Sequence, residues 1–205
     1  LLARLAFPSA ALGCAESTAQ RLTAEPWAAQ RSLRNFDQEH YVLARPPLSL
    51  GSVQALPVPG RLALGEQREL ELHPAEGHTA DGVAFLPPWL DSIVCGDSLS
   101  PLEIPMICEG GSIEAYLDTL GRLRPLVERC ATVVPGHGAP YPRDQALQVL
   151  AEDIEYLKAL SADGARARLP AERRSSTQKR IHEENATREH PGRRARALRN
   201  ASSYS

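Results

Sequence analysis

The sequence predicts an α/β domain in which a sheet and helices form separate layers. In residues 52–97, short runs alternate apolar and polar residues with the period of two that is typical of strands. Two long segments follow, 111–130 and 142–160, in which apolar residues recur every three or four positions, as in amphipathic helices. A short apolar run at 131–135 lies between them and predicts a further buried strand. Strands and helices in this order pack as layers around one core.

The N-terminal part of the chain predicts a short strand and two helices. Residues 9–15 are small and mostly apolar, which is typical of a buried strand. Residues 16–40 are polar, with apolar side chains at near-helical spacing, and Pro26 suits the first turn of a second helix. The proline-containing stretch 45–51 predicts a loop.

The middle of the chain predicts four strands. Residues 52–60 and 68–78 alternate apolar and polar side chains, and 81–90 and 91–97 are two shorter strand-like runs. The turn between the last two is expected near Leu90.

The C-terminal half predicts helices and sets the expected domain limits. Ser112 can cap the first amides of the helix over 111–130, and residues 169–190 are typical of a surface helix. We expect one domain over 1–163, a basic C-terminal helix over 164–190 packed on it or flanking it, and a disordered tail over 191–205.

The composition is that of an ordinary globular chain, with 42% hydrophobic and 23% charged residues. No apolar run reaches the roughly 18 residues of a membrane span, and no signal peptide is visible, so we expect a cytoplasmic protein without membrane contact. The cysteines lack the C-x-x-C spacing of metal sites and predict reduced core thiols. They are Cys14, Cys95, Cys108 and Cys130.

Charge is distributed unevenly along the chain. Residues 164–205 carry 11 Lys and Arg against 4 Asp and Glu, whereas the remainder carries 12 against 21. A basic tail can bind nucleic acid or an acidic partner, but a solvated helix followed by a disordered end explains the charge more simply. The acidic body has no stripe of aromatic and basic residues, which argues against a nucleic-acid partner.

Four of the histidines have no clear functional setting. His40, His182 and His190 lie in polar helical stretches and are expected to be exposed. His73 lies next to Pro74, at the end of a predicted strand in which apolar and polar residues alternate, and this position does not favour a functional role.

Two histidines and one aspartate stand out by their place in the sequence. His78 in "EGHTADG" and His137 in "VVPGHGAP" each follow a glycine at a predicted strand end, and Asp97 has the same place after "SIVCG". A carboxylate is costly to bury unless it is hydrogen-bonded or holds a cation. Each residue alone is typical of an ordinary turn. Their order along the chain favours a site assembled from several loops.

At these residues the chain resembles the metallo-β-lactamase superfamily, which includes the glyoxalase II-like thioesterases. The matching motifs are "GHTADG", "CGDSLS" and "VVPGHG", in this order, and the resemblance spans roughly residues 1–185. It implies an αββα sandwich and a metal-dependent hydrolase that uses a metal-activated water on an ester, thioester or related acyl bond. The implied partner is a small-molecule acyl substrate.

The resemblance also implies roles for individual residues. His78 would bind the first metal, His137 the second, and Asp97 would bridge the two and help to orient the water. Thr79 and Asp81 could contact His78 and fix its tautomer, although Asp81 is also typical of the first residue of a turn before Gly82. Two zinc ions are the expected cofactors, with iron or manganese as alternatives.

The superfamily signature His-x-His-x-Asp-His, which supplies most of the metal ligands, is absent from the 205 residues. Because Met106 is the sole methionine and the first residues resemble the segment after that signature, we expect an N-terminally incomplete domain. Loss of an early strand would expose a sheet edge, so a homo-oligomer is also expected.

Other functions remain open at this point. The chain could be a non-catalytic metallo-β-lactamase-like fragment that acts in binding or assembly. It could also be a nuclease of the same superfamily that uses its basic tail. The loop 99–112 follows Asp97 directly, and we expect it to form one wall of the pocket, with Glu103, Ile104 and Met106 near the site.

Overall fold

The computed structural model describes residues 3–45, 48–49 and 51–189. The chain divides into two compact units, Leu1–Gly60 and Arg61–Ser205. The predicted tail 191–205 and His190 lie outside the described residues. The predicted limits at 163 and 190 stay predictions.

The first unit contains helices and a small parallel sheet. Strands β1 and β2 pair in parallel, with Leu12 opposite Val53. The predicted strand at 9–15 forms, but only Ala15 in it is buried, so the expectation of a buried strand was wrong. The described elements are α1 (Ala3–Ala6), β1 (Leu12–Ala15), α2 (Glu16–Ala24), α3 (Ala28–Glu39) and β2 (Val53–Leu56).

A second helix follows Pro26, as the sequence predicts, but Pro26 lies before the N-cap residue Trp27, so its predicted place in the first turn was wrong. Helix α2 ends before it, and α3 begins two residues after it. The described part of the predicted loop 45–51 contains no helix or strand.

The second unit is built on one mixed sheet. Among the described residues this sheet has six strands in the order β3-β4-β5-β6-β7-β8. Strand β5 is antiparallel to β4 and β6, β7 is parallel to β6, and β8 is antiparallel to β7. The strands are β3 (Gly60–Ala63), β4 (Glu69–Pro74), β5 (Val83–Leu86), β6 (Ser92–Gly96), β7 (Thr132–Pro135) and β8 (Tyr141–Pro142). Strands β3 and β8 are not predicted from the sequence. The predicted turn near Leu90 is a short 3-10 helix, η1 (Pro88–Leu90).

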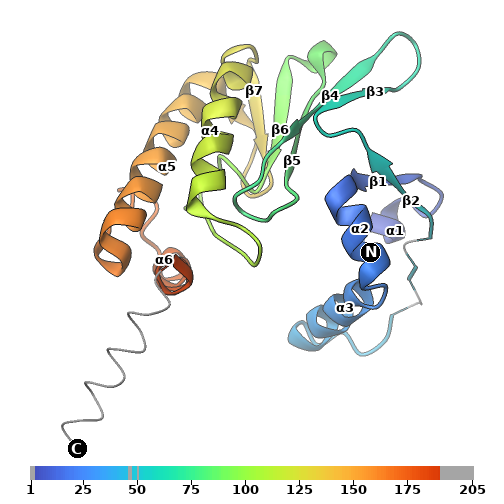
Figure 1. The fold of residues 1–205 in the computed structure, drawn as a ribbon, viewed down its shortest axis with the longest axis horizontal. Coiled ribbons are helices and arrows are strands. Elements are labelled where there is room, and N and C mark those ends of the chain that lie inside the picture. Colours follow the sequence, from blue (N-terminus) through green and yellow to red (C-terminus); the bar gives the residue numbers. More distant parts are fainter. Residues whose placement is uncertain (1–2, 46–47, 50, 190–205) are drawn as a thin grey trace, which may run out of the picture. The chain divides into compact units, whose positions relative to one another are not determined.

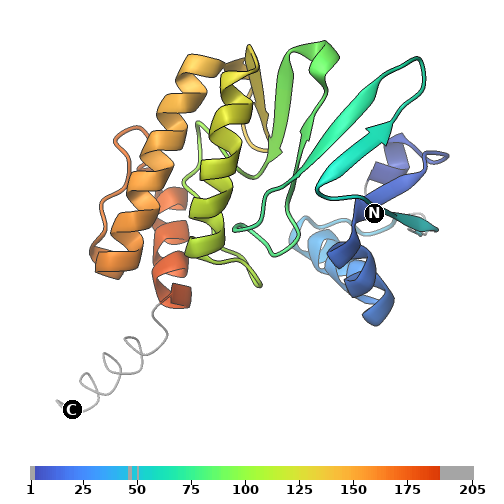
Figure 2. The same ribbon diagram turned by 45° about the horizontal axis from the view of Figure 1, so that its top comes forward.

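Two long helices cover the sheet. Helix α4 (Ile113–Glu128) is the crossover between the parallel strands β6 and β7. It lies beside α5 (Arg143–Asp163), and both contact the sheet, as Figures 1 and 2 show. Ser112 caps α4 as predicted, with its hydroxyl accepting a hydrogen bond from Ala115 N at 3.1 Å. Leu120, Leu123, Leu150 and Leu157 are fully buried between these layers.

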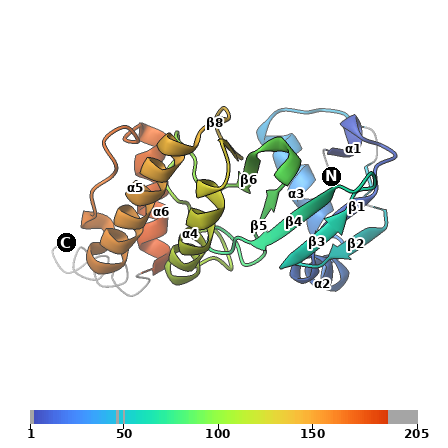
Figure 3. The same ribbon diagram turned by 90° about the horizontal axis from the view of Figure 1, so that it is seen from above.

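Helix α6 (Ser176–Glu189) packs against α5, which is visible from above in Figure 3. Its predicted character as a surface helix was wrong for one face, which buries Gln178, Ile181, Asn185 and Ala186. The prediction that His182 is exposed was also wrong. Its side chain is buried, and its ring nitrogens contact the Tyr156 hydroxyl at 3.1 Å and the Ala165 carbonyl at 3.2 Å.

The prediction that His40 is exposed is confirmed. Across the described ranges, we find no helix with the length and apolar character needed to span a bilayer.

Candidate metal centre

Strand direction brings the three singled-out residues to one edge of the sheet. Asp97 directly follows β6, and His137 comes two residues after β7, its parallel neighbour. His78 lies in the loop after β4, which runs in the same direction as β6 because both are antiparallel to β5. All three loops therefore leave the same edge.

The glycine before each histidine allows a close approach of backbone segments. Gly77 has a φ of 129°, and a Cβ there would overlap the Tyr116 backbone on α4. A Cβ at Gly136 would lie 2.5 Å from Asp97 Oδ1 and 2.9 Å from Gly96 O. Only glycine fits at both positions. The "GH" motifs are therefore requirements of the local packing as well as carriers of an imidazole.

Asp97 lies between the two histidines. Its Oδ2 is 3.1 Å from His78 Nε2, and its Oδ1 is 3.5 Å from His137 Nε2. Each imidazole therefore faces a different oxygen of one carboxylate. Glu103 approaches the same centre, with Oε2 3.9 Å from His137 Nε2.

The ring of His78 is oriented by a backbone carbonyl. Its Nδ1 is 2.8 Å from Met106 O and donates to it, which leaves Nε2 directed at Asp97. The Sγ of Cys108 is 3.7 Å from the same Nε2. Cys108, beside this site, and Cys14 are half-buried, so their assignment to the core was wrong, whereas Cys95 and Cys130 are buried as expected.

The predicted supporting residues lie in the same turn as His78. The backbone carbonyl of Thr79 accepts a hydrogen bond from Gly77 N at 2.9 Å, which closes the turn. The Nδ1 partner that the structure shows for His78 is Met106. Roles for the side chains of Thr79 and Asp81 stay predictions.

The ion pair of His78 and Asp97 shifts the pKa of both side chains. The hydrogen bond to Asp97 raises the pKa of His78 above its usual value, although desolvation opposes this. The same bond lowers the pKa of Asp97, again against desolvation. Because a histidine binds a metal ion through an unprotonated nitrogen, a cation at Nε2 would displace this hydrogen bond to Asp97.

The arrangement of these side chains bears on whether they fit a metal ion. In residues 3–45, 48–49 and 51–189, no group of three or more His, Cys, Asp or Glu side chains has a metal-holding arrangement. This agrees with the distances, because the two imidazoles approach different oxygens of Asp97. Imidazole nitrogens and a carboxylate are donors that suit zinc, iron and manganese. The donor chemistry fits a carboxylate shared by two ions, each of which needs further ligands.

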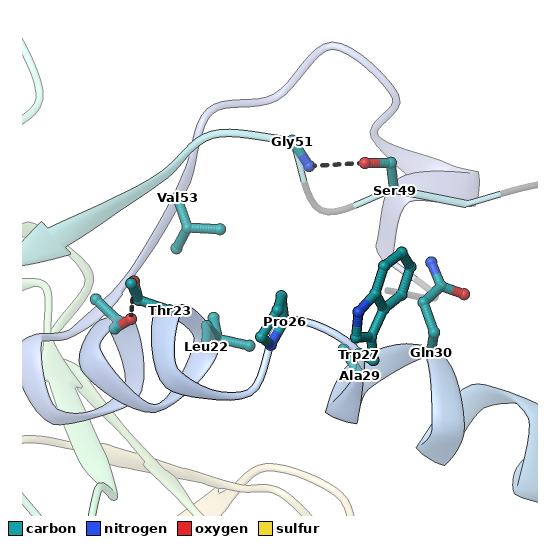
Figure 4. A pocket seen from close by; sticks show the side chains of 10 residues that line it. Leu22, Thr23, Pro26, Trp27, Ala29, Gln30, Ser49, Gly51 and Val53 are labelled. Atoms are coloured by element: carbon teal, nitrogen blue, oxygen red, sulfur yellow. Dashed lines mark hydrogen bonds between the residues drawn. The ribbon is translucent and has the colours of Figure 1, made fainter.

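A hollow in the first unit has different chemistry. It encloses about 360 Å³ and lies between α2, α3 and the segment before β2 (Figure 4). Leu22, Pro26, Trp27, Gln30 and Val53 are among its lining residues, none of which titrates near neutral pH. Its described lining offers no acid or base to a substrate.

Comparisons with known proteins bear on the fold. No protein-family model matches the sequence, and no curated protein sequence matches it either. Solved structures do match. A metallo-β-lactamase from Pontibacter korlensis is 17% identical, with a TM-score of 0.50, over 73% of this chain and 60% of that protein.

Two further structures agree with the first. A metallo-β-lactamase family protein from Thermus thermophilus is 18% identical, with a TM-score of 0.53, over 89% of this chain and 67% of that one. An archaeal superfamily protein from Sulfolobus tokodaii is 17% identical, with a TM-score of 0.56, over 91% and 72%. The chain has a metallo-β-lactamase fold. The predicted fold class is thereby confirmed.

Proposed function

We propose that this chain provides part of a two-metal hydrolase centre, in which Asp97 is shared by two ions. His78 would hold one ion and His137 the other. The observation that carries the proposal is that each imidazole faces a different oxygen of Asp97, with Nε2–oxygen distances of 3.1 and 3.5 Å. A carboxylate between two imidazoles at one strand edge is the arrangement that a shared ligand requires, and the fold is that of metallo-β-lactamase superfamily proteins.

Zinc is the proposed metal, with iron or manganese as alternatives for the same donor set. When bound, the ions act as Lewis acids on the substrate oxygen and lower the pKa of a coordinated water. Three donors would leave other coordination positions of two ions unfilled. We propose that a His-x-His-x-Asp-His segment outside residues 1–205 fills them.

The chain's own residues orient this centre. The Met106 carbonyl holds His78 in the tautomer that presents Nε2. The Ser100 hydroxyl donates to the His137 carbonyl at 2.9 Å, and the Tyr116 hydroxyl donates to the Asp97 carbonyl at 3.0 Å. Asp97 and His137 are therefore held through their backbone carbonyls, and we propose that the Asp97 carboxylate would also orient a water when the ions are bound. That second role is our proposal for Asp97 in catalysis.

The substrate we propose is a small molecule with an ester, thioester or related acyl bond. The loop 99–112 would form one wall of its pocket, with Glu103 next to His137. An acidic body does not suit a nucleic-acid track, so a small acyl compound is favoured over a polynucleotide.

Metal analysis of the full-length protein tests the assignment. Elemental analysis after zinc loading and gel filtration should show lower zinc content for His78→Ala and His137→Ala. The matched control is His40→Ala, which removes an exposed imidazole at the end of α3 and should leave zinc content at the wild-type level. Wild-type stoichiometry in His137→Ala would remove that residue from the ligand set and refute the shared-carboxylate arrangement.

A further inference from the structure

We infer that Asn185 on α6 is a positioning residue for His78, acting through the loop that carries Met106. The loop in question, residues 99–108, is called the site loop here. The inference rests on the proposed metal centre for its functional meaning, but the hydrogen bonds that carry it do not involve a metal. It assigns α6 the task of holding one face of the site in place.

The Asn185 side chain forms hydrogen bonds with the site loop on both sides of Met106. Its Oδ1 accepts a hydrogen bond from Ile107 N at 2.9 Å, and its Nδ2 donates to Pro105 O at 2.7 Å. Asn185 has no exposed surface. The Met106 carbonyl between these two contacts accepts the proton of His78 Nδ1. A continuous path of hydrogen bonds and peptide units therefore joins Asn185 to the imidazole.

Two more residues from the C-terminal part of the chain form hydrogen bonds with the site loop. Gln178, which is 4% exposed, accepts a hydrogen bond from Ile104 N at 2.8 Å through Oε1. Arg173 donates from Nη1 to Ser100 O at 3.3 Å and to Glu103 O at 2.8 Å. Its guanidinium is held in turn by Asp153 Oδ1 at 2.6 Å.

These contacts replace the backbone hydrogen bonds that a helix or strand would supply. The site loop contains no helix or strand, so its buried amides and carbonyls need other partners. Side chains of residues 173–185 supply them, from 70 to 80 residues further along the chain. A buried polar group without a partner is costly, so the site loop can keep this path only while the partners stay in place.

A purely structural role for Asn185 would predict a different outcome from positioning. If Asn185 only stabilises the domain, any substitution of equal destabilising effect would change His78 equally. If Asn185 positions Met106, the bond from His78 Nδ1 should weaken specifically when Asn185 is shortened. The matched control is Val149→Ala on α5, which removes core packing at a residue that is 6% exposed and has an apolar side chain.

The experiment measures solvent exchange of the His78 Nδ1 proton by NMR in the metal-free protein labelled with ¹⁵N-histidine. The signal is assigned by its loss in His78→Gln. We expect exchange about fivefold faster in Asn185→Ala, which corresponds to one net hydrogen bond, and unchanged in Val149→Ala at comparable loss of stability. Gln178→Ala serves as the second variant if Asn185→Ala does not fold, with a smaller increase expected because its contact is two residues from Met106.

The inference is overturned if Asn185→Ala keeps wild-type exchange while folded. It is also overturned if Val149→Ala accelerates exchange equally, since Asn185 would then be structural only. Its failure is separable from failure of the proposed function. Loss of zinc binding in His137→Ala tests the metal centre, whereas the exchange measurement uses protein without metal.

Discussion

The buried ion pair of Arg173 and Asp153 makes a sharp prediction about stability. Each side chain is 1% exposed, and Nη1 lies 2.6 Å from Oδ1. Asp153→Asn keeps the shape of the side chain and leaves the guanidinium without its buried counter-charge. Removing one partner of a buried pair typically costs about 3–5 kcal/mol. Here we expect a value near the lower limit, because Glu152 and two loop carbonyls still accept from Arg173.

Glu152 provides the matched comparison within the same cluster. Its Oε2 is 3.1 Å from Arg173 Nη2, but its side chain is 31% exposed. Water already solvates this carboxylate in part, so Glu152→Gln should cost less than about 1 kcal/mol. The two substitutions change the same type of group one residue apart and differ mainly in burial.

Urea denaturation followed by circular dichroism measures both costs. The measurement belongs at pH 8, well above the usual range of a carboxyl pKa, so that both carboxylates are ionised. Equal costs for the two variants, or a cost below about 1 kcal/mol for Asp153→Asn, would refute the reasoning. Arg173→Met combined with Asp153→Leu removes both charges and should recover part of the loss, but not all, since loop carbonyls lose their donor.

Three further predictions concern a helix cap, a thiol and the ion pair. Ser112→Ala should lower the free energy of unfolding by about 1 kcal/mol in urea titrations, because it removes the α4 cap; no change would argue against that cap. Burial raises the pKa of the Cys95 thiol to about 12, so a thiol reagent such as DTNB should label half-buried Cys108 in the native protein and Cys95 only after unfolding. In the metal-free protein, the pair of Asp97 and His78 should stabilise the folded state fully between pH 3.8 and 6.5, which are the ordinary pKa values of the two groups. This stabilisation should be lost as the pH falls through the lowered pKa of Asp97, and also as the pH rises through the raised pKa of His78. The stability difference between wild type and Asp97→Asn, followed against pH, should therefore be largest in that window, and a flat difference would contradict it.

The layered fold and the three strand-end residues could be predicted because their signals are local. Strand alternation, the helical spacing in α4 and α5, and the Ser112 cap all lie within a few residues of the structure they specify. The glycines before His78 and His137 also mark sharp turns within their own motifs.

The support of the site could not be predicted because its partners are distant in sequence. Gln178 and Asn185 are polar residues in a polar helix, and nothing near them in the sequence identifies the site loop as the segment whose backbone they contact. The burial of His182 escapes prediction for the same reason, since its partner Tyr156 lies 26 residues earlier. The buried positions of α6 do follow helical spacing, but only Ile181 and Ala186 among them are apolar. A helical spacing of amides with two apolar residues is the signal that could have indicated this face.

The long sequence separation between the site loop and its partners has a consequence for synthesis of the protein. The ribosome delivers Asp97, Met106 and His137 well before Asn185. Until that residue has emerged, the site loop has no partner for Ile107 N or Pro105 O, and His78 has no fixed acceptor behind it. Closing so long a connection is an entropic cost that is met late in folding. A nascent chain arrested before residue 185 should therefore hold the sheet and the long helices with the imidazole still free to turn.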